Sequence, residues 1–87
     1  MKEFTAKIVD PIGLHARPTS ILVTVASKYK SDIKLQSGGR EANLKSIMNI
    51  MSLGVKCGAE VTVKVMGEDE QEAFDAIHDV FVKNELI

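Results

Sequence analysis

The sequence predicts an α+β protein, an open-faced two-layer sandwich of order βαββαβα with three helices on one face of a four-stranded, mostly antiparallel sheet. Segments that alternate apolar and other residues, as half-buried strands do, are interspersed with segments whose apolar residues recur at helical spacing. Glycine-containing turns separate several of these segments. Because the chain has 87 residues and no internal repeat or linker, we expect one domain over residues 1–87.

The N-terminal part of the chain is predicted to form a strand and then a helix. Apolar Phe4, Ala6 and Ile8 alternate with other side chains, which indicates a half-buried strand. The sequence DPIG at 10–13 interrupts this pattern and predicts a turn. Residues 16 to about 28 then carry apolar side chains at helical spacing, at Leu22, Val25, Ala26 and Tyr29.

The middle of the chain is predicted to form a β-hairpin. Ile33 and Leu35 alternate with polar residues and therefore indicate a second strand. The sequence SGGR at 37–40 predicts a tight turn, because paired glycines adopt positive φ without strain. A short third strand is therefore expected to run through Glu41 and Ala42.

A short helix is predicted to follow the hairpin. Its apolar residues cluster over 47–51, and either Ser46 or Asn43 can cap its first turn through a side-chain oxygen. Gly54 is suited to end this helix, because the residue after a helix often adopts positive φ.

The last third of the chain is predicted to form a strand and a final helix. Valines at alternate positions over 61–65 give the clearest strand pattern in the chain, and Gly67 ends it. Asp69 is expected to cap the helix, with Glu72 as its partner in a capping box. The buried stripe of this helix is expected to consist of Ala73, Phe74, Ile77, Val80 and Phe81.

Composition limits the classes of function and the partners. The formal net charge of −1, with 11 basic and 12 acidic residues, argues against a nucleic-acid partner. The single cysteine, Cys57, has no partner for a disulfide and no ligands at metal spacing, so no metal site is expected. The N-terminal segment lacks the apolar core of a signal peptide, and no apolar run could span a membrane. We therefore expect a cytoplasmic protein without membrane insertion.

The octapeptide GLHARPTS at 13–20 carries the most specific chemistry. Pro18 suits the first turn of a helix, which places His15 at the helix N-terminus, where free N–H groups attract phosphate. The positive end of a helix favours a neutral imidazole, which can act as a nucleophile, and Arg17 offers a bidentate contact to a phosphoryl group. The ordinary alternative is a surface histidine beside a solvated arginine, and these residues alone leave both interpretations open.

Two motifs resemble one known family. GLHARP at 13–18 resembles the phosphorylation-site motif of HPr, the histidine-containing phosphocarriers of the bacterial phosphoenolpyruvate-dependent sugar phosphotransferase system. NLKSIMNIMSLG at 43–54 resembles the regulatory serine segment of the same family, in its Gram-positive form. Length, element order and the positions of both motifs agree, so the resemblance covers essentially the whole chain.

The resemblance implies a role for each residue of the first motif. His15 would accept a phosphoryl group at Nδ1 from the phosphorylated enzyme I and pass it to sugar-specific EIIA components. Arg17 would neutralise the phosphoryl group, and the backbone amides of Ala16 and Arg17 would hold it. A protein of this family is a phosphocarrier rather than an enzyme, and it needs no cofactor.

The resemblance also implies regulation at Ser46, where HPr kinase/phosphorylase would add a phosphoryl group from ATP. The negative charge of phosphoserine is tolerated at a helix N-terminus, yet it changes the surface potential met by an acidic partner. A plain helix cap is the structural alternative for Ser46. A purely regulatory relative acting through Ser46 is the alternative function, although such relatives lack the histidine that is present here.

The predicted short helix carries more apolar residues than one buried face requires. We therefore expect part of it to form a docking patch beside His15, with Thr19 and Ser20 at its border and Ile47, Met48 and Met51 within it. In the family this surface meets enzyme I, EIIA and, in some lineages, a transcriptional repressor. We expect a monomer, because a carrier must expose its site.

Overall fold

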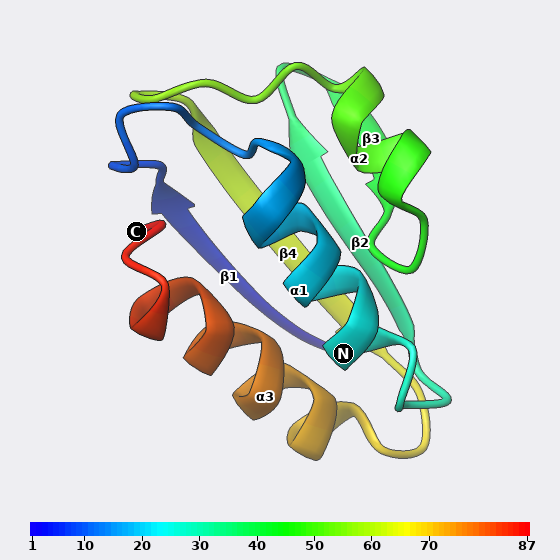
Figure 1. Ribbon diagram of the computed structural model, residues 1–87. Coiled ribbons are helices and arrows are strands. Elements are labelled where there is room, and N and C mark those ends of the chain that lie inside the picture. The colour runs from blue at the N-terminus through cyan, green and yellow to red at the C-terminus, as the bar shows by residue number, and fades with distance from the viewer.

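The computed structural model describes residues 1–87 and confirms the predicted element order. Its four strands form one sheet in the order β1-β4-β2-β3, and all three pairings are antiparallel (Figure 1). The strands are β1 (Lys2–Lys7), β2 (Asp32–Ser37), β3 (Arg40–Asn43) and β4 (Glu60–Met66). The helices are α1 (Ala16–Ala26), α2 (Ile47–Ser52) and α3 (Glu70–Lys83).

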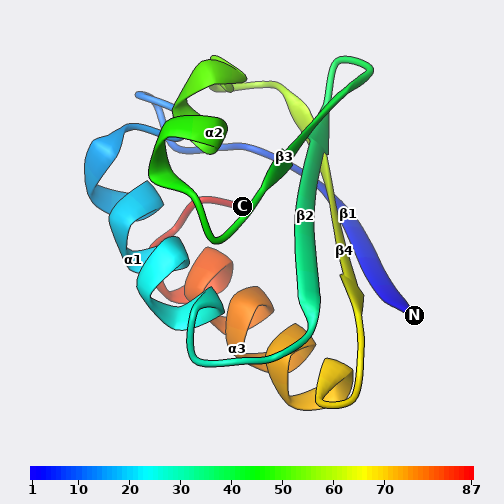
Figure 2. The ribbon, with the colours of Figure 1, turned by 90° about the vertical axis from the view of Figure 1, so that its right-hand side faces the viewer.

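The three helices cover one face of the sheet, as the turned view shows (Figure 2). The alternation read from the sequence explains this arrangement. In β4 the valines at 61, 63 and 65 are fully buried, whereas the residues between them are partly exposed. Register places Val63 between Phe4 of β1 and Leu35 of β2, so the apolar side chains of neighbouring strands share one face.

The helices close the core from the other side. Leu22 and Ala26 of α1 have no exposed surface, and Ile50 of α2 is almost fully buried. The buried stripe predicted for α3 is confirmed except that Phe74 is only partly buried, packed edge-on against Phe4. None of the three helices combines the length and the hydropathy that a membrane span requires.

The predicted hairpin turn is confirmed, and the predicted capping box is wrong. Gly38 and Gly39 both adopt positive φ between β2 and β3. At the start of α3, by contrast, the Asp69 side chain makes no capping bond to its own helix. Its carboxylate instead accepts hydrogen bonds from the Ser31 hydroxyl and from the backbone N–H groups of Lys30 and Ser31. A tertiary contact therefore competes successfully with the local cap.

These hydrogen bonds set the acidity of Asp69. The Ser31 hydroxyl and then the Lys30 N–H stabilise the carboxylate and lower the pKa of Asp69 to about 2. The bonds join the start of α3 to the loop that links α1 to β2, at the opposite end of α1 from His15.

Candidate functional site

The loop that leads into α1 is fixed by a glycine that no other residue can replace without strain. Gly13 has φ +82°, a conformation that side chains rarely adopt. A Cβ atom there would lie 2.5 Å from the carbonyl oxygen of Val55. The neighbouring Leu14 donates its N–H to that same carbonyl at 3.0 Å. The loop is therefore held tightly against the segment that precedes β4, and its direction into α1 is determined.

His15 is the N-cap residue of α1. Its backbone is extended, with φ −85° and ψ −179°, and its side chain makes no capping hydrogen bond. The first hydrogen bond of the helix runs from the Thr19 N–H to the His15 carbonyl at 3.2 Å. The N–H groups of Ala16 and Arg17 precede that bond, and Pro18 has no N–H. The helix therefore begins with free donors directly beside the imidazole.

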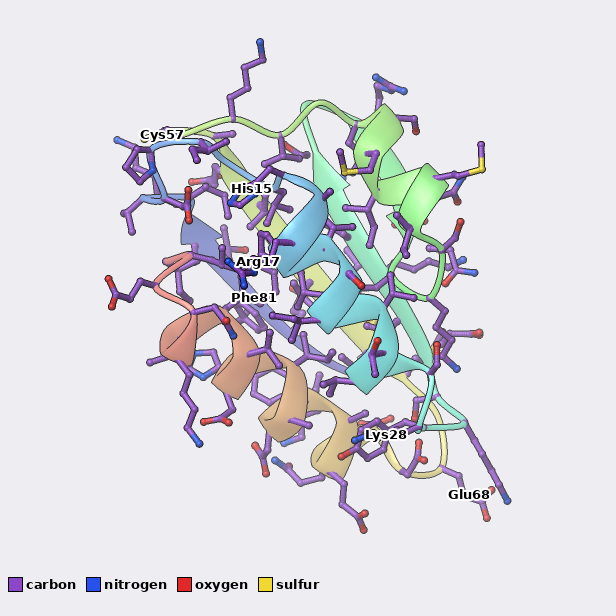
Figure 3. The ribbon with its side chains drawn as sticks, viewed as in Figure 1. His15, Arg17, Lys28, Cys57, Glu68 and Phe81 are labelled. Carbon is purple, nitrogen blue, oxygen red and sulfur yellow. The ribbon has the colours of Figure 1, made fainter.

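A cavity of about 450 Å³ opens at this helix start. Figure 3 shows His15 and Arg17 near the start of α1, on the side of the helix that faces the end of α3. The lining residues come from three parts of the chain: Asp10, His15, Arg17, Pro18, Ile21 and Asn84. The structure thus brings together the two side chains that the sequence singled out for phosphoryl chemistry.

Asp10 is a member of the site that the sequence analysis missed. Its Oδ2 lies 3.9 Å from His15 Nε2, and the two side chains are 19% and 34% exposed. Its Oδ1 accepts a hydrogen bond from the Ile12 N–H at 2.9 Å, which closes a turn. Asp followed by Pro-Ile-Gly signals a turn, but the sequence does not show that the turn directs the carboxylate at the histidine.

Two further lining residues were also missed. Ile21 lies one turn beyond Arg17 on α1, so its helical spacing could have indicated a shared face. Asn84, the C-cap residue of α3, comes from the far end of the chain. Only the packing of α3 beside α1 brings Asn84 to the site, and no local pattern encodes that contact.

Ser46 begins the second helix in a different manner. It is the N-cap of α2, and its Oγ accepts a hydrogen bond from the Asn49 N–H at 3.2 Å. The sequence left Ser46 and Asn43 as alternative caps, and the structure selects Ser46. Asn43 instead accepts from the Lys45 N–H through its own side chain. Ser46 as a whole is only partly exposed.

Ser46 does not lie at the histidine end of α1. Its neighbour Lys45 donates from Nζ to the carbonyl of Tyr29 at 2.7 Å. Tyr29 follows the C-terminal end of α1, whereas His15 precedes its N-terminal end. An 11-residue helix is about 16 Å long at 1.5 Å per residue. Any influence of Ser46 on His15 therefore has to pass through a shared surface or through the electric field rather than through direct contact.

The apolar side chains of α2 divide between the core and the surface, as the sequence predicted. Ile50 is buried, whereas Met48 is 84% exposed, and Ile47 and Met51 are about half as exposed as Met48. In α1, Ser20 is exposed. Thr19 is fully buried, so its side chain cannot contact a partner and its placement at the border of a docking patch was wrong. It shares the buried face of α1 with Leu22 and Ala26, three and seven residues further on.

Comparison with known proteins gives a consistent set of similarities. The family model described as the phosphorylation site of the HPr component of the phosphotransferase system matches residues 2–83. Phosphocarrier protein HPr of Mycoplasma genitalium is 51% identical over 88 residues, which cover 100% of both chains.

Solved structures agree with that similarity. A histidine-containing phosphocarrier protein from Mycoplasma superposes with a TM-score of 0.97 at 42% identity, over 99% of this chain and 98% of that one. The Bacillus subtilis catabolite repression protein Crh, solved as a dimer with a swapped domain, has a TM-score of 0.74 at 39% identity. That match covers 100% of this chain and 99% of the other.

Proposed function

This chain belongs to the HPr family, the phosphocarrier proteins of the phosphotransferase system, and we propose that His15 is the residue on which it carries the phosphoryl group. Membership makes the protein a phosphoryl carrier and not an enzyme. In the proposed cycle, His15 accepts the group from phosphorylated enzyme I and passes it to sugar-specific EIIA components in the cytoplasm.

One observation carries this proposal: an uncapped helix start beside a partly exposed imidazole. The lone pair of a ring nitrogen attacks phosphorus, a P–N bond forms, and the bond between phosphorus and the donor breaks with its electron pair on the donor. The group then lies next to the free N–H donors of Ala16 and Arg17. Arg17, which lines the same cavity, adds a charged donor that neutralises the phosphoryl oxygens.

Delivery requires a surface that several partners recognise. We propose that the exposed side chains of α2, namely Ile47, Met48 and Met51, form this surface with Ser20 of α1. Methionine suits such a surface, because its flexible thioether side chain adapts to different partners. The exposure of Met48 supports the assignment, since a side chain with this area in water gains from being covered.

Regulation is proposed to act through Ser46. A phosphoryl group added there by HPr kinase/phosphorylase would remain compatible with the start of α2, because helix N-termini favour negative charge. It would also place about two negative charges beside the docking surface and disfavour acidic partners. A transcriptional repressor is a further partner proposed for this surface.

A monomeric state is part of the proposal, because α1 and α2 must both be free to meet partners. The dimer of Crh shows that a similar chain can assemble in another way. Light scattering of the purified protein at two concentrations tests this point, and a stable dimer that covers α2 would contradict it.

The experiment follows the phosphoryl group through both transfers. The purified chain is incubated with phosphoenolpyruvate and enzyme I, separated from the donor, and then mixed with an EIIA domain while intact masses are recorded. We expect this chain to gain one phosphoryl group and then to lose it as EIIA gains one. No gain, in an assay where a known HPr is phosphorylated, would contradict the carrier function and leave regulation through Ser46 as the function to test.

A further inference from the structure

We propose that Asp10 is a positioning residue for phosphoryl transfer: its carboxylate keeps the ring proton of His15 on Nε2 and thereby leaves the lone pair of Nδ1 free to attack phosphorus. The contact that motivates this inference is the 3.9 Å approach of Asp10 Oδ2 to His15 Nε2. The inference rests on the proposed function of His15 and adds a determinant of which ring nitrogen reacts.

The Asp10 side chain is held in place by its own turn. Oδ1 accepts the Ile12 N–H at 2.9 Å, and the Asp10 carbonyl accepts the Gly13 N–H at 2.9 Å. With one carboxylate oxygen bound in this way, the other oxygen is directed toward the imidazole. The side chain is 19% exposed, so water weakens its field only in part.

The backbone before Asp10 is held by hydrogen bonds to two other segments of the chain. The Val9 N–H donates to the Leu86 carbonyl at 2.8 Å, and the Ile8 carbonyl accepts the Gly58 N–H at 2.7 Å. The chain on the far side of the turn is fixed by Gly13 and its neighbour Leu14. Asp10 and His15 therefore face each other across a loop whose backbone is held by hydrogen bonds on both sides.

The chemistry of the imidazole explains what this contact does. A neutral imidazole carries its proton on one nitrogen and its lone pair on the other, and the partner of one nitrogen decides which is which. A carboxylate accepts hydrogen bonds and cannot donate them, so Asp10 favours the proton on Nε2, the nitrogen that it faces. The lone pair is then on Nδ1.

The proton count stays balanced through the cycle. Nδ1 attacks phosphorus and the donor takes the electron pair of the bond that breaks, while Nε2 keeps its proton. The phosphorylated ring then carries positive charge, which the Asp10 carboxylate offsets. On delivery the P–N bond breaks, its electron pair returns to Nδ1, and no proton has moved on the ring.

No other group around the cavity can take this role. Asp10 is the only carboxylate among the six lining residues. Arg17 carries donors alone, and the side-chain amide of Asn84 donates to the Val80 carbonyl at 3.0 Å. Ile12 contributes its N–H to the turn, but its side chain is apolar and 69% exposed.

The first test measures the tautomer without any phosphoryl transfer. Two-bond ¹H–¹⁵N NMR spectra of the free protein at about pH 8, where an ordinary imidazole is neutral, report which nitrogen carries the proton. Asp10→Asn retains an oxygen for the Ile12 N–H but presents an amide donor to the ring. We expect the Nε2–H form in the wild type and a population shifted toward Nδ1–H in Asp10→Asn.

Two further variants separate charge from turn geometry. Asp10→Ser keeps a short side-chain acceptor for the turn without a carboxylate, so it is expected to lose the tautomer preference while it retains the thermal stability. Asp32→Asn removes the same charge at the exposed start of β2 and is expected to behave as the wild type in every measurement.

The second test follows phosphoryl transfer from enzyme I by rapid quenching. We expect Asp10→Asn to slow transfer about two- to fivefold, the size of a partly exposed charge contact, and Asp32→Asn to leave the rate unchanged. An unchanged tautomer and an unchanged rate in a folded Asp10→Asn protein would overturn the inference. A wild type that accepts no phosphoryl group would overturn the proposed function, and the NMR spectra would still show whether Asp10 sets the tautomer.

Discussion

The starts of α1 and α2 offer a direct comparison, because each is led by a residue that we propose to be phosphorylated. His15 and Ser46 both adopt extended N-cap backbones. The Ser46 hydroxyl oxygen accepts the Asn49 N–H, which is the third donor of α2, and the N–H groups of Ile47 and Met48 stay free. The His15 ring makes no such bond, because the third position of α1 is Pro18, which has no N–H, and the N–H groups of Ala16 and Arg17 stay free.

The two helices also differ in length. α2 has six residues, too few to be stable alone, so a side-chain cap contributes to its existence. α1 has 11 residues and buries Leu22 and Ala26 in the core, so packing stabilises it without a cap. Both helix starts keep two free N–H donors, so what distinguishes α1 is the His15 ring and the Arg17 side chain beside its donors.

Replacing the glycine in the loop beside each helix by alanine is expected to give the largest difference in unfolding free energy. Gly13→Ala introduces a side chain at φ +82° and 2.5 Å from the Val55 carbonyl oxygen, and we expect it to cost about 3 kcal/mol or more in unfolding free energy. Gly54→Ala, after α2, also has positive φ but nothing within 4 Å, and it should cost about 1 kcal/mol. Urea denaturation of both variants measures the difference.

The two glycine variants also test whether the loop conformation at Gly13 positions His15 for phosphoryl acceptance. Because Gly13 sets the entry into α1, Gly13→Ala should slow phosphoryl acceptance even under conditions where the variant stays folded. Equal costs for the two alanines would show that the close approach to Val55 does not constrain the loop.

Substitutions of Ser46 test separately its capping hydrogen bond to Asn49 and its proposed role in regulation. Ser46→Ala removes the acceptor for Asn49 and should cost about 1 kcal/mol in stability while leaving transfer through His15 unchanged. Ser46→Asp keeps a capping oxygen and adds a negative charge, so stability should be retained and transfer should fall about three- to tenfold. Equal transfer rates in Ser46→Asp and the wild type would contradict electrostatic regulation through Ser46.

Removal of one exposed side chain from α2 tests the docking surface. Met48→Ala should leave the unfolding free energy nearly unchanged, because Met48 is 84% exposed, yet it should weaken binding to enzyme I about fivefold. Val82→Ala removes an exposed apolar residue of α3 and serves as the control. Equal affinities for enzyme I in the two variants, measured by titration calorimetry, would exclude Met48 from the interface.

The start of α3, at Asp69, is a third helix start to compare, and its substitution is expected to have the smallest effect on stability. The pKa of Asp69 is lowered to about 2 by hydrogen bonds from Ser31 and Lys30, so its contribution to stability is present above the ordinary aspartate pKa, near 4. That contribution is lost as the pH falls from about 4 through about 2. Asp69→Asn should reduce this part of the pH dependence of unfolding, measured in urea between pH 5 and pH 2.

Glu70 responds to pH in the same direction, because a hydrogen bond from the Met1 ammonium and one from the Gly67 N–H lower its pKa. Asp69→Asn should therefore remove only part of the acid sensitivity. Transfer through His15 at neutral pH should be unaffected, since Asp69 lies at the other end of α1. An unchanged slope of stability against pH would contradict the role assigned to the Asp69 hydrogen bonds.

Periodicity was sufficient to predict the elements but not the contacts between them. The alternating valines of β4 and the buried stripe of α3 follow directly from burial on one face, so they could be read from the chain. The burial of Thr19 could also have been read, because it lies three residues before Leu22 on the same helical face. The capping motif at Asp69 gave a wrong prediction. The Asp69 carboxylate instead accepts three hydrogen bonds from Lys30 and Ser31, which are distant in the sequence.

The candidate site was also predicted only in part: residues of the local motif were identified, and residues brought in by the fold were not. The sequence identified His15 and Arg17 through a motif that combines helix-start chemistry with phosphate chemistry. It could not identify Asp10 as a partner of the ring, because that depends on the path that Gly13 imposes on the loop. Asn84 is separated from His15 by most of the chain, and only the finished fold brings both to one cavity.

The most direct test of the central claim is to locate the phosphoryl group delivered by enzyme I. The wild type, His15→Ala and Ser46→Ala are each incubated with phosphoenolpyruvate and enzyme I, and their intact masses are recorded before and after acid treatment. We expect one acid-labile phosphoryl group on the wild type and on Ser46→Ala, and none on His15→Ala. A folded His15→Ala protein that still gains the group, or a group that survives acid, would contradict the assignment of His15 as the carrier.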